Sequence, residues 1–185
     1  SKDWTYRKLK ETVLTTANGF LNRGLKSQDR ILLRLDNTVE FPIAFLAAIS
    51  VDIKPVPLSA QLTNQEIVLL ADIVNAKAVC LDPALSFPPA LDIETITIDE
   101  LRLMQMKEPA NFCMGSPNRL AYIVFTSGTS GSPKAVMHAH RAPLLPRRAP
   151  LAQSLQMRAL PSARPAPTAP SKAARASLHA KCARL

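Results

Sequence analysis

The hydrophobic residues of the first 141 positions follow helical spacing in some segments and strand spacing in others. From Tyr6 to about Arg23, apolar residues recur every three or four positions, so a helix is predicted there with Thr5 as its N-terminal cap. Its predicted buried face consists of Tyr6, Leu9, Val13, Ala17, Phe20 and Leu21. Short continuous apolar runs predict strands at 30–35, 76–81, 95–98, 120–125 and 135–138. Further helices are predicted at 40–50, 63–75 and 99–104.

Individual residues sharpen several of these elements. Residues 40–50 are apolar on nearly all sides and are therefore predicted to form a buried helix. Thr63 and Glu66 have the spacing of a capping box, and Asp99 is the predicted cap of the last short helix. Residues 55–58, Pro-Val-Pro-Leu, are predicted to be extended, because proline fixes φ and lacks the N–H donor of a strand ladder.

The alternation of strands and helices restricts the fold class. Strands that are apolar along their whole length are typical of parallel sheets, whose two faces are covered by helices. The sequence therefore predicts an α/β fold over residues 1–141, with a partial parallel sheet flanked by helices.

Composition divides the chain near Arg141. Residues 1–141 contain 15 basic and all 14 acidic residues, a net charge of 15 − 14 = +1, whereas residues 142–185 contain the other 23 − 15 = 8 basic residues and no acidic one. No Phe, Trp or Tyr follows Phe125, and seven of the 16 prolines lie in 143–185. Residues 142–185 contain too few large apolar side chains for their burial to offset the conformational entropy lost on folding. This segment is therefore predicted to be a disordered basic tail.

Three interpretations of this tail remain open. Ala/Pro/Arg-rich sequence without acidic residues is what a GC-rich gene yields when it is read out of frame, so the first interpretation is a frameshift or assembly product. The second is a native tail. The third is a non-enzymatic, truncated chain whose tail binds nucleic acid. Eight charges without interleaved aromatic residues would give only a salt-sensitive, non-specific contact, so nucleic acid is not the expected partner.

Cysteine and hydropathy patterns bear on the location of the protein. The cysteines at 80, 113 and 182 include no Cys-x-x-Cys pair, so neither a disulfide framework nor a zinc site is expected. The expected location is the reducing cytoplasm. No apolar run reaches 18 residues, so no membrane span is expected. The chain starts at Ser1 without a methionine, and it is therefore expected to be processed or a fragment.

The most specific chemical signal is the polar loop that follows the predicted strand at 120–125. Residues 126–134 read Thr-Ser-Gly-Thr-Ser-Gly-Ser-Pro-Lys. Glycines let successive backbone N–H groups face one anion, the hydroxyls add donors, and Lys134 adds a positive charge. The predicted phosphate-binding residues are Thr126, Ser127, Gly128, Thr129, Ser130, Gly131 and Lys134. The loop is not a Walker A motif, because Pro133 precedes the lysine and Ala135 follows it, and a Ser/Gly-rich surface loop is the alternative.

This loop resembles the signature Thr-Ser-Gly-Thr-Thr-Gly-x-Pro-Lys-Gly of the adenylate-forming enzymes, the family of acyl-CoA synthetases, peptide-synthetase adenylation domains and luciferases. It departs at Ser130, which keeps the hydroxyl, and at Ala135, which replaces a glycine and matters only if that position needs positive φ. The upstream order of a Thr-Tyr-x-x-Leu start, an Asp-Arg strand, a buried helix and a Val-Pro step is also similar, across roughly residues 4–141. Asp52 stands where the family usually has glycine, so a distorted turn is expected before Lys54.

The resemblance implies an activity, its cofactors and its partners. The family activates a small-molecule carboxylic acid with ATP and magnesium, and acyl-CoA synthetases, the most similar group, are ligases that pass the acyl group to coenzyme A. The resemblance also calls for a Tyr-Gly-x-Thr-Glu stretch, a Thr-Gly-Asp stretch and a C-terminal catalytic lysine, and residues 142–185 contain none of these patterns. We therefore assign no catalytic residue, and we expect this N-terminal fragment of the family's fold to bind ATP phosphates weakly at most and to be inactive alone.

Three other groups of residues have alternative interpretations. His138 and His140 would share one face of a strand, but the nearest further ligand is Cys113, 25 positions away, so strand-end or surface histidines are favoured over a metal site. The neighbouring carboxylates at 99–100 point apart and are interpreted as a helix start. The methionines at 104 and 106 are interpreted as the edge of the core.

Overall fold

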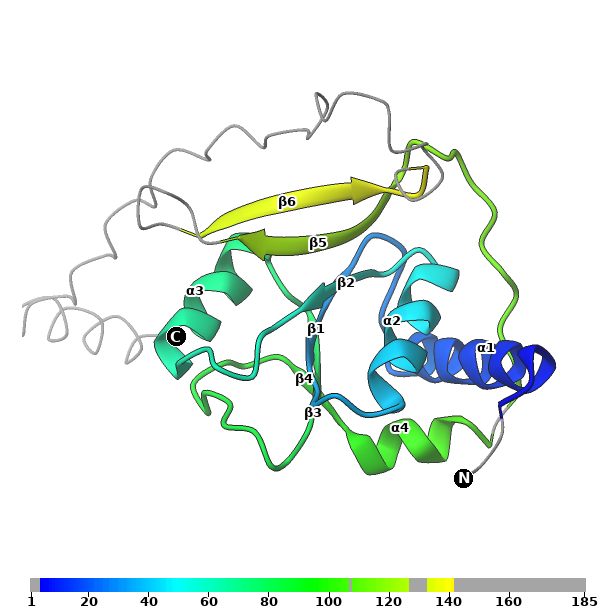
Figure 1. The fold of residues 1–185 in the computed structure, drawn as a ribbon, viewed down its shortest axis with the longest axis horizontal. Helices are drawn as coiled ribbons and strands as arrows, with labels where there is room; N and C mark the ends of the chain where they lie inside the picture. The colour runs from blue at the N-terminus through cyan, green and yellow to red at the C-terminus, as the bar shows by residue number, and fades with distance from the viewer. Residues whose placement is uncertain (1–3, 107, 127–132, 142–185) are drawn as a thin grey trace, which may run out of the picture.

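The computed structural model describes residues 4–106, 108–126 and 133–141, and Figure 1 shows how they are arranged. Four helices and six strands lie within these ranges. In chain order they are α1 (Tyr6–Asn22), β1 (Arg30–Arg34), α2 (Glu40–Ser50), β2 (Lys54–Pro57), α3 (Asn64–Val74), β3 (Ala78–Leu81), β4 (Glu94–Thr97), α4 (Ile98–Met104), β5 (Leu120–Thr126) and β6 (Lys134–Ala139). The predicted tail, residues 142–185, lies outside the described residues, as do residues 127–132 of the predicted phosphate loop.

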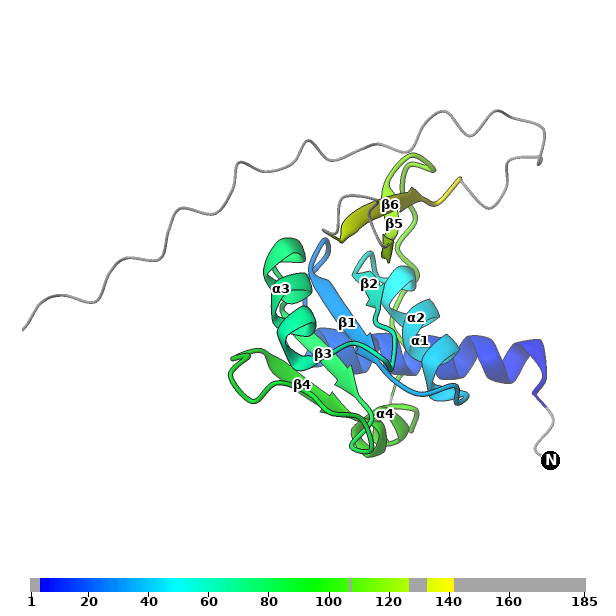
Figure 2. The same cartoon turned by 60° about the vertical axis from the view of Figure 1, so that its left-hand side comes forward.

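The first four strands form one parallel sheet in the order β2-β1-β3-β4. Helices α1, α2 and α4 pack on one face of this sheet and α3 packs on the other (Figures 1 and 2). The predicted fold class, an α/β fold with a partial parallel sheet flanked by helices, is confirmed.

Strand β1 shows why the strands are apolar along their length. Ile31 and Leu33 face the cluster formed with α1, α2 and α4, whereas Leu32 faces the cluster formed with α3. All three side chains are fully buried. Because successive side chains of a strand point to opposite faces, a strand covered on both sides needs apolar residues at every position.

The helix starts confirm two capping predictions, at Thr5 and Thr63, and correct a third. The Thr5 hydroxyl accepts from the backbone N–H of Lys8 at 3.2 Å at the start of α1. The Thr63 hydroxyl accepts from the backbone N–H of Glu66, and the Glu66 carboxylate accepts from the Thr63 N–H at 2.8 Å, so the predicted capping box starts α3. A second capping box, between Thr97 and Glu100, starts α4. The prediction that Asp99 caps α4 is therefore wrong. β4 ends at Thr97 and the helix begins at the next residue, which places Asp99 inside the first turn.

Two predicted apolar faces are less buried than expected. Tyr6 is 93 % exposed and Leu21 is also exposed, so the buried side of α1 is narrower than the pattern indicated. Helix α2 is not buried all round, because it packs through the small residues Ala44, Ala47 and Ala48 and leaves Leu46 exposed. Both differences have the same cause. Within the described residues, each of these helices packs on the rest of the protein with one face and is exposed to solvent on the other.

Strands β5 and β6 form a separate antiparallel hairpin that lies along β2 (Figure 1). The sequence predicted both strands but not their antiparallel pairing. In β2 and just after it, the backbone N–H groups of Lys54 and Leu58 donate toward β1 at 2.8 and 3.0 Å. The alternate positions between them, Pro55 and Pro57, have no N–H to offer the opposite edge. The hairpin therefore lies beside the parallel sheet without extending it.

The turn before β2 is formed by Asp52 in a left-handed conformation, with φ = 64°. The backbone N–H of Lys54 still donates to the carbonyl of Asp29 at 2.8 Å, and Arg30 still pairs with Lys54 in register. The expected distortion of this turn is therefore wrong. Aspartate adopts the conformation that glycine adopts most easily, and its carboxylate is held there by hydrogen bonds.

Candidate phosphate-binding site

The end of the β5–β6 hairpin next to the predicted loop carries the two predicted phosphate-binding residues that lie within the described ranges. Thr126 and Lys134 are the last pair of the antiparallel register, on either side of the predicted loop. Residues directly opposite each other in such a pair project from the same face, so a hydroxyl and an ammonium group lie together at this end. Both residues are exposed, as a site for a soluble anion requires.

The other five predicted residues, Ser127, Gly128, Thr129, Ser130 and Gly131, lie outside the described residues, so their role stays a prediction. Ala135, which replaces a glycine of the signature, lies in β6 opposite Phe125. Within the described ranges, positive φ occurs only at Gln28, Asp52, Asn75 and Gly24. The backbone at position 135 therefore does not have the positive φ that would favour glycine there.

The charge around the hairpin favours an anion. Residues 109–141 contain three basic residues, Arg119, Lys134 and Arg141, and no Asp or Glu. Within the described residues, Lys134 makes no ion pair, so its charge is not neutralised by a neighbouring carboxylate there. A surface of one sign attracts ligands of the opposite sign, and here the ligand would be negatively charged.

Four polar residues lie at the opposite end of the hairpin, and we call them the base cluster. Arg119 and His140 flank the hairpin strands, and Asp52 and Lys54 lie just before and at the start of β2. Lys54 donates to the Asp52 carboxylate at 2.5 Å, and Nε of Arg119 lies 3.7 Å from the same oxygen. Burial raises the pKa of Asp52, but hydrogen bonds from Lys54 and Ser27 and the charge of Lys54 outweigh it, so this pKa is lowered. Sequence reasoning missed this cluster, although Asp52 and Lys54, two opposite charges in the otherwise apolar segment 51–58, were a usable signal.

The two histidines of β6 and its end have different surroundings. The His138 ring stacks on Tyr122, with centroids 4.6 Å apart, and Tyr122 in turn contacts Phe45 of α2 at 5.3 Å. His140 follows β6 and belongs to the base cluster. Within the described ranges, no three His, Cys, Asp or Glu side chains come together as a metal would need.

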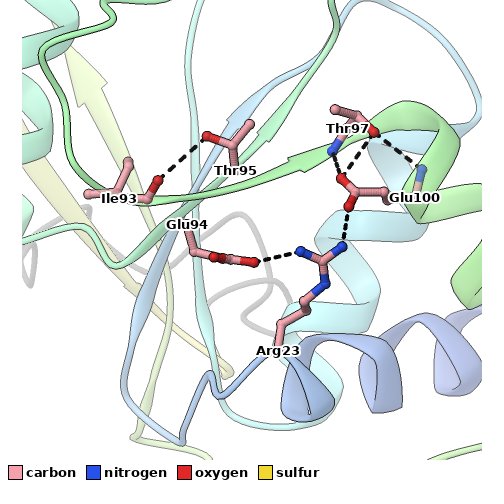
Figure 3. Close-up of polar contacts among 6 residues, drawn as sticks. All are labelled: Arg23, Ile93, Glu94, Thr95, Thr97 and Glu100. Carbon is pink, nitrogen blue, oxygen red and sulfur yellow. Dashed lines mark hydrogen bonds and ion pairs between the residues drawn. The ribbon is translucent and has the colours of Figure 1, made fainter.

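Besides the residues near the predicted loop and the base cluster, a further set of ion-paired side chains connects the end of α1 with β4 and α4. Arg23 donates to Glu94 at 2.6 Å and also to Glu100. The other carboxylate oxygen of Glu100 accepts from the Thr97 backbone N–H at 2.8 Å (Figure 3). The Thr97 backbone N–H, and then Arg23, lower the pKa of Glu100. The interpretation of residues 99–100 as a helix start is confirmed, and we regard these ion pairs as structural.

Two hollows in the described surface lie away from the hairpin. One, of about 270 Å³, is lined by Gly19, Arg23, Glu100 and Met104, between α1 and α4. Another, of about 540 Å³, is lined by Val68, Leu69, Leu91 and Ile93 beside α3. Met104 itself is buried in the core and Met106 is 84 % exposed, so the core edge runs between the two methionines.

No helix in the described part of the chain combines the length and the apolar character that crossing a bilayer requires.

Comparison with known proteins places this hairpin in context. A family model described as AMP-binding enzyme matches residues 1–159. The 4-hydroxybenzoate–CoA/benzoate–CoA ligase of Rhodopseudomonas palustris is 29 % identical over 158 residues, which cover 75 % of this chain and 29 % of that protein. A plipastatin synthase component of Bacillus subtilis is 30 % identical over 139 residues, which cover 74 % of this chain and 5 % of that protein.

A solved structure gives the same picture. The benzoate CoA ligase from Burkholderia xenovorans LB400 superposes with a TM-score of 0.66 at 25 % identity, covering 74 % of this chain and 29 % of that one. The chain thus spans less than a third of the length of each of these three proteins. The family model, by contrast, matches most of this chain. The chain therefore belongs to the AMP-binding enzyme family.

Proposed function

We propose that this chain provides the ATP phosphate-binding part of an enzyme that activates a carboxylic acid as an acyl-adenylate and passes it to coenzyme A. The observation that carries the proposal is the exposed pair of Thr126 and Lys134, which brackets a glycine- and hydroxyl-rich loop in a hairpin region without acidic residues. Relatives named as CoA ligases of aromatic and other acids support the reaction class.

The reaction defines what these residues would do. A substrate carboxylate oxygen attacks the α-phosphorus of ATP, the bond to the bridging oxygen breaks, and pyrophosphate leaves with the electron pair. A thiol then attacks the acyl carbon and AMP leaves. Phosphoryl transfer of this kind depends on positioning and on charge stabilisation. Lys134 and Thr126, with the loop between them, would hold the β- and γ-phosphates, and magnesium would neutralise charge on the same phosphates when bound.

We propose that the 185-residue chain binds ATP but does not complete the reaction alone. Adenylation in this family calls for carboxylates that act on magnesium and on the ribose, and residues 109–185 contain no Asp or Glu. Carboxylate-dependent exchange of pyrophosphate into ATP, measured on the purified chain, tests this directly. Exchange above the level of a Lys134→Ala variant would show that the chain is competent without further partners.

ATP binding is the primary test of the phosphate site. Lys134→Ala should weaken ATP binding by about 10- to 100-fold, the range expected for a lost charged hydrogen bond. Lys77→Ala is the matched control, because Lys77 is also exposed but precedes β3 in the parallel sheet. Calorimetric titration of both variants with ATP compares them. Equal ATP affinities for Lys134→Ala and Lys77→Ala would exclude the proposed site.

The same preparation separates this proposal from the nucleic-acid alternative. The tail carries eight basic residues and no acidic one, which is the single observation in favour of that alternative. Deleting residues 142–185 should leave Lys134-dependent ATP binding intact. Salt-sensitive DNA binding that disappears with this deletion, without any effect of Lys134→Ala on ATP, would support the nucleic-acid function instead.

A further inference from the structure

The hairpin that carries Lys134 is attached to the parallel sheet in an unusual way. β5 runs along β2, yet the edge of β2 that faces it offers prolines at positions 55 and 57 in place of N–H donors. Within the described residues, the two strands belong to separate sheets. Contacts other than a strand ladder, side-chain contacts among them, therefore determine where the hairpin sits, and with it the position of Lys134.

The base cluster supplies polar contacts of this kind. Arg119, immediately before β5, brings its Nε to 3.7 Å from Oδ1 of Asp52, which also accepts from Lys54 at 2.5 Å. A terminal nitrogen of Arg119 donates to the carbonyl of Cys113 at 2.8 Å. The N–H of Cys113 donates to the carbonyl of Ser50 at 2.8 Å. The base of the hairpin is thus linked both to the turn before β2 and to the end of α2.

The cluster is buried enough for these contacts to matter. The side chains of Lys54, Asp52 and Arg119 are 1 %, 8 % and 17 % exposed. A single carboxylate lies between two cations, so removing it or adding a third cation would leave buried positive charge uncompensated. Such an imbalance costs much more inside a protein than at its surface.

His140 is the fourth member, at the other strand of the hairpin. Its backbone N–H donates to the carbonyl of Arg119 at 3.1 Å, which closes the base of the hairpin. Within the described residues, both Nε2 of His140 and Nε of Arg119 are buried without a hydrogen-bond partner. Burial, and then the charges of Arg119 and Lys54, lower the pKa of His140, against a smaller opposing effect of Asp52. The neutral imidazole is thus the form that fits beside the two cations.

We propose that Arg119 and His140 are positioning residues that clamp the base of the phosphate-site hairpin onto Asp52 and Lys54, and so fix Lys134 relative to the parallel sheet. The link to ATP rests on the function proposed above, whereas the clamp itself is a property of the fold. In the clamped state His140 is neutral. A proton on His140 adds a third positive charge beside one carboxylate and loosens the hairpin.

Hydrogen exchange of the full chain tests the clamp separately from ATP binding. Arg119→Gln should speed exchange of the amides in 120–126 and 134–139 by about tenfold or more, as expected for a lost charged contact, and leave β1 and β3 unchanged. Arg141→Gln is the matched control, because Arg141 is exposed and lies next to the same hairpin. Unchanged hairpin exchange in Arg119→Gln, or equal acceleration in β1 and β3, would overturn the proposal.

The pH dependence provides a second test, which does not require Arg119 to be altered. After correction for intrinsic exchange, the hairpin amides of the natural chain should exchange faster below pH ~6.5, the ordinary pKa of histidine, and those of β1 and β3 should not. His140→Gln cannot take up a proton and should abolish this acid-specific acceleration. An acid response that persists in His140→Gln would overturn the role of His140.

ATP titrations of the same variants distinguish the two proposals. If Lys134→Ala weakens ATP binding by about 10- to 100-fold and Arg119→Gln weakens it by about tenfold with faster hairpin exchange, both proposals hold. If Arg119→Gln leaves ATP affinity and hairpin exchange unchanged while Lys134→Ala weakens binding, the clamp is wrong and the phosphate site stands. If Arg119→Gln loosens the hairpin but Lys134→Ala does not affect ATP, the clamp stands and the phosphate site is wrong.

Discussion

In the parallel sheet, apolar side chains are buried on both faces of the strands, whereas in the β5–β6 hairpin most side chains are half-buried. Ile31, Leu32 and Leu33 of β1 are fully buried between α3 on one side and the other helices on the opposite side. In β6, Lys134 is exposed and the five residues after it are all half-buried. Apolar burial, the main source of folding free energy, is therefore concentrated in the sheet.

The two regions also differ in how they are connected. Each strand of the parallel sheet is hydrogen-bonded to its neighbours, but the hairpin meets the sheet edge at prolines and relies on side chains such as Tyr122, Phe45 and the base cluster. The candidate phosphate site lies at the end of the less buried region. A rigid sheet that carries a separately attached binding element is a common way to place a functional loop.

The largest predicted effect comes from the core of the sheet region. Phe20 of α1 is fully buried, so Phe20→Ala should lower the free energy of unfolding by about 3–5 kcal/mol. Val136 of β6 is half-buried, and Val136→Ala should cost about 1 kcal/mol. Urea unfolding followed by circular dichroism measures both. Equal losses would mean that the hairpin belongs to the same core as the sheet.

A buried arginine predicts the next largest effect. The Arg34 side chain is 1 % exposed and donates to four backbone carbonyls, those of Ser59, Ala60, Leu62 and Ser86. Arg34→Met leaves these carbonyls without their donor and should cost about 2–4 kcal/mol. The matched control is Arg7→Met at an exposed position of α1, with an expected change within about 0.5 kcal/mol. Similar midpoints for the two variants would show that water replaces the guanidinium at little cost.

The sequence predicted the parts of this structure that depend on neighbouring residues. The capping box at Thr63, the strands that are apolar throughout and the amphipathic α1 all follow from spacing within one element. The exposure of Tyr6 and Leu46 does not, because it depends on where other helices end. The cap of α4 was predicted at Asp99 instead of Thr97, although Thr97 and Glu100 have the same capping-box spacing as Thr63 and Glu66. The strand predicted at 95–98 placed Thr97 inside a strand and hid this signal.

The features that escaped prediction join distant residues. Asp52 and Arg119 are 119 − 52 = 67 positions apart, and no periodicity relates a glycine-like turn to an arginine before a later strand. The antiparallel pairing of β5 with β6 was missed because a run of apolar residues specifies a strand but not its partner. At the candidate site, sequence order predicted Thr126 and Lys134 as phosphate-binding residues, which stays a prediction, and the structure added that they are opposite each other in register.

A moderate effect is predicted at the ion pairs of Arg23, where α4 joins the sheet. Glu100→Gln weakens the capping box and one ion pair, and should cost about 1 kcal/mol at neutral pH. The pKa of Glu100 is lowered on folding, so its contribution is present above the ordinary glutamate pKa and disappears as pH falls through the lowered value. Stability curves of the natural chain and Glu100→Gln should therefore converge in acid. A constant difference down to low pH would contradict this assignment.

The smallest predicted effect on stability belongs to the residue expected to matter most for ATP. Lys134 is exposed at the end of the hairpin and, within the described residues, forms no ion pair, so Lys134→Ala removes a charge without removing a contact that supports the fold. Its melting temperature should stay within about 2 °C of that of the natural chain. Thermal unfolding with and without ATP measures this. A large drop without ATP would mean that Lys134 supports the hairpin itself, and the loss of ATP binding in this variant would then reflect unfolding of the site and not the absence of a phosphate contact.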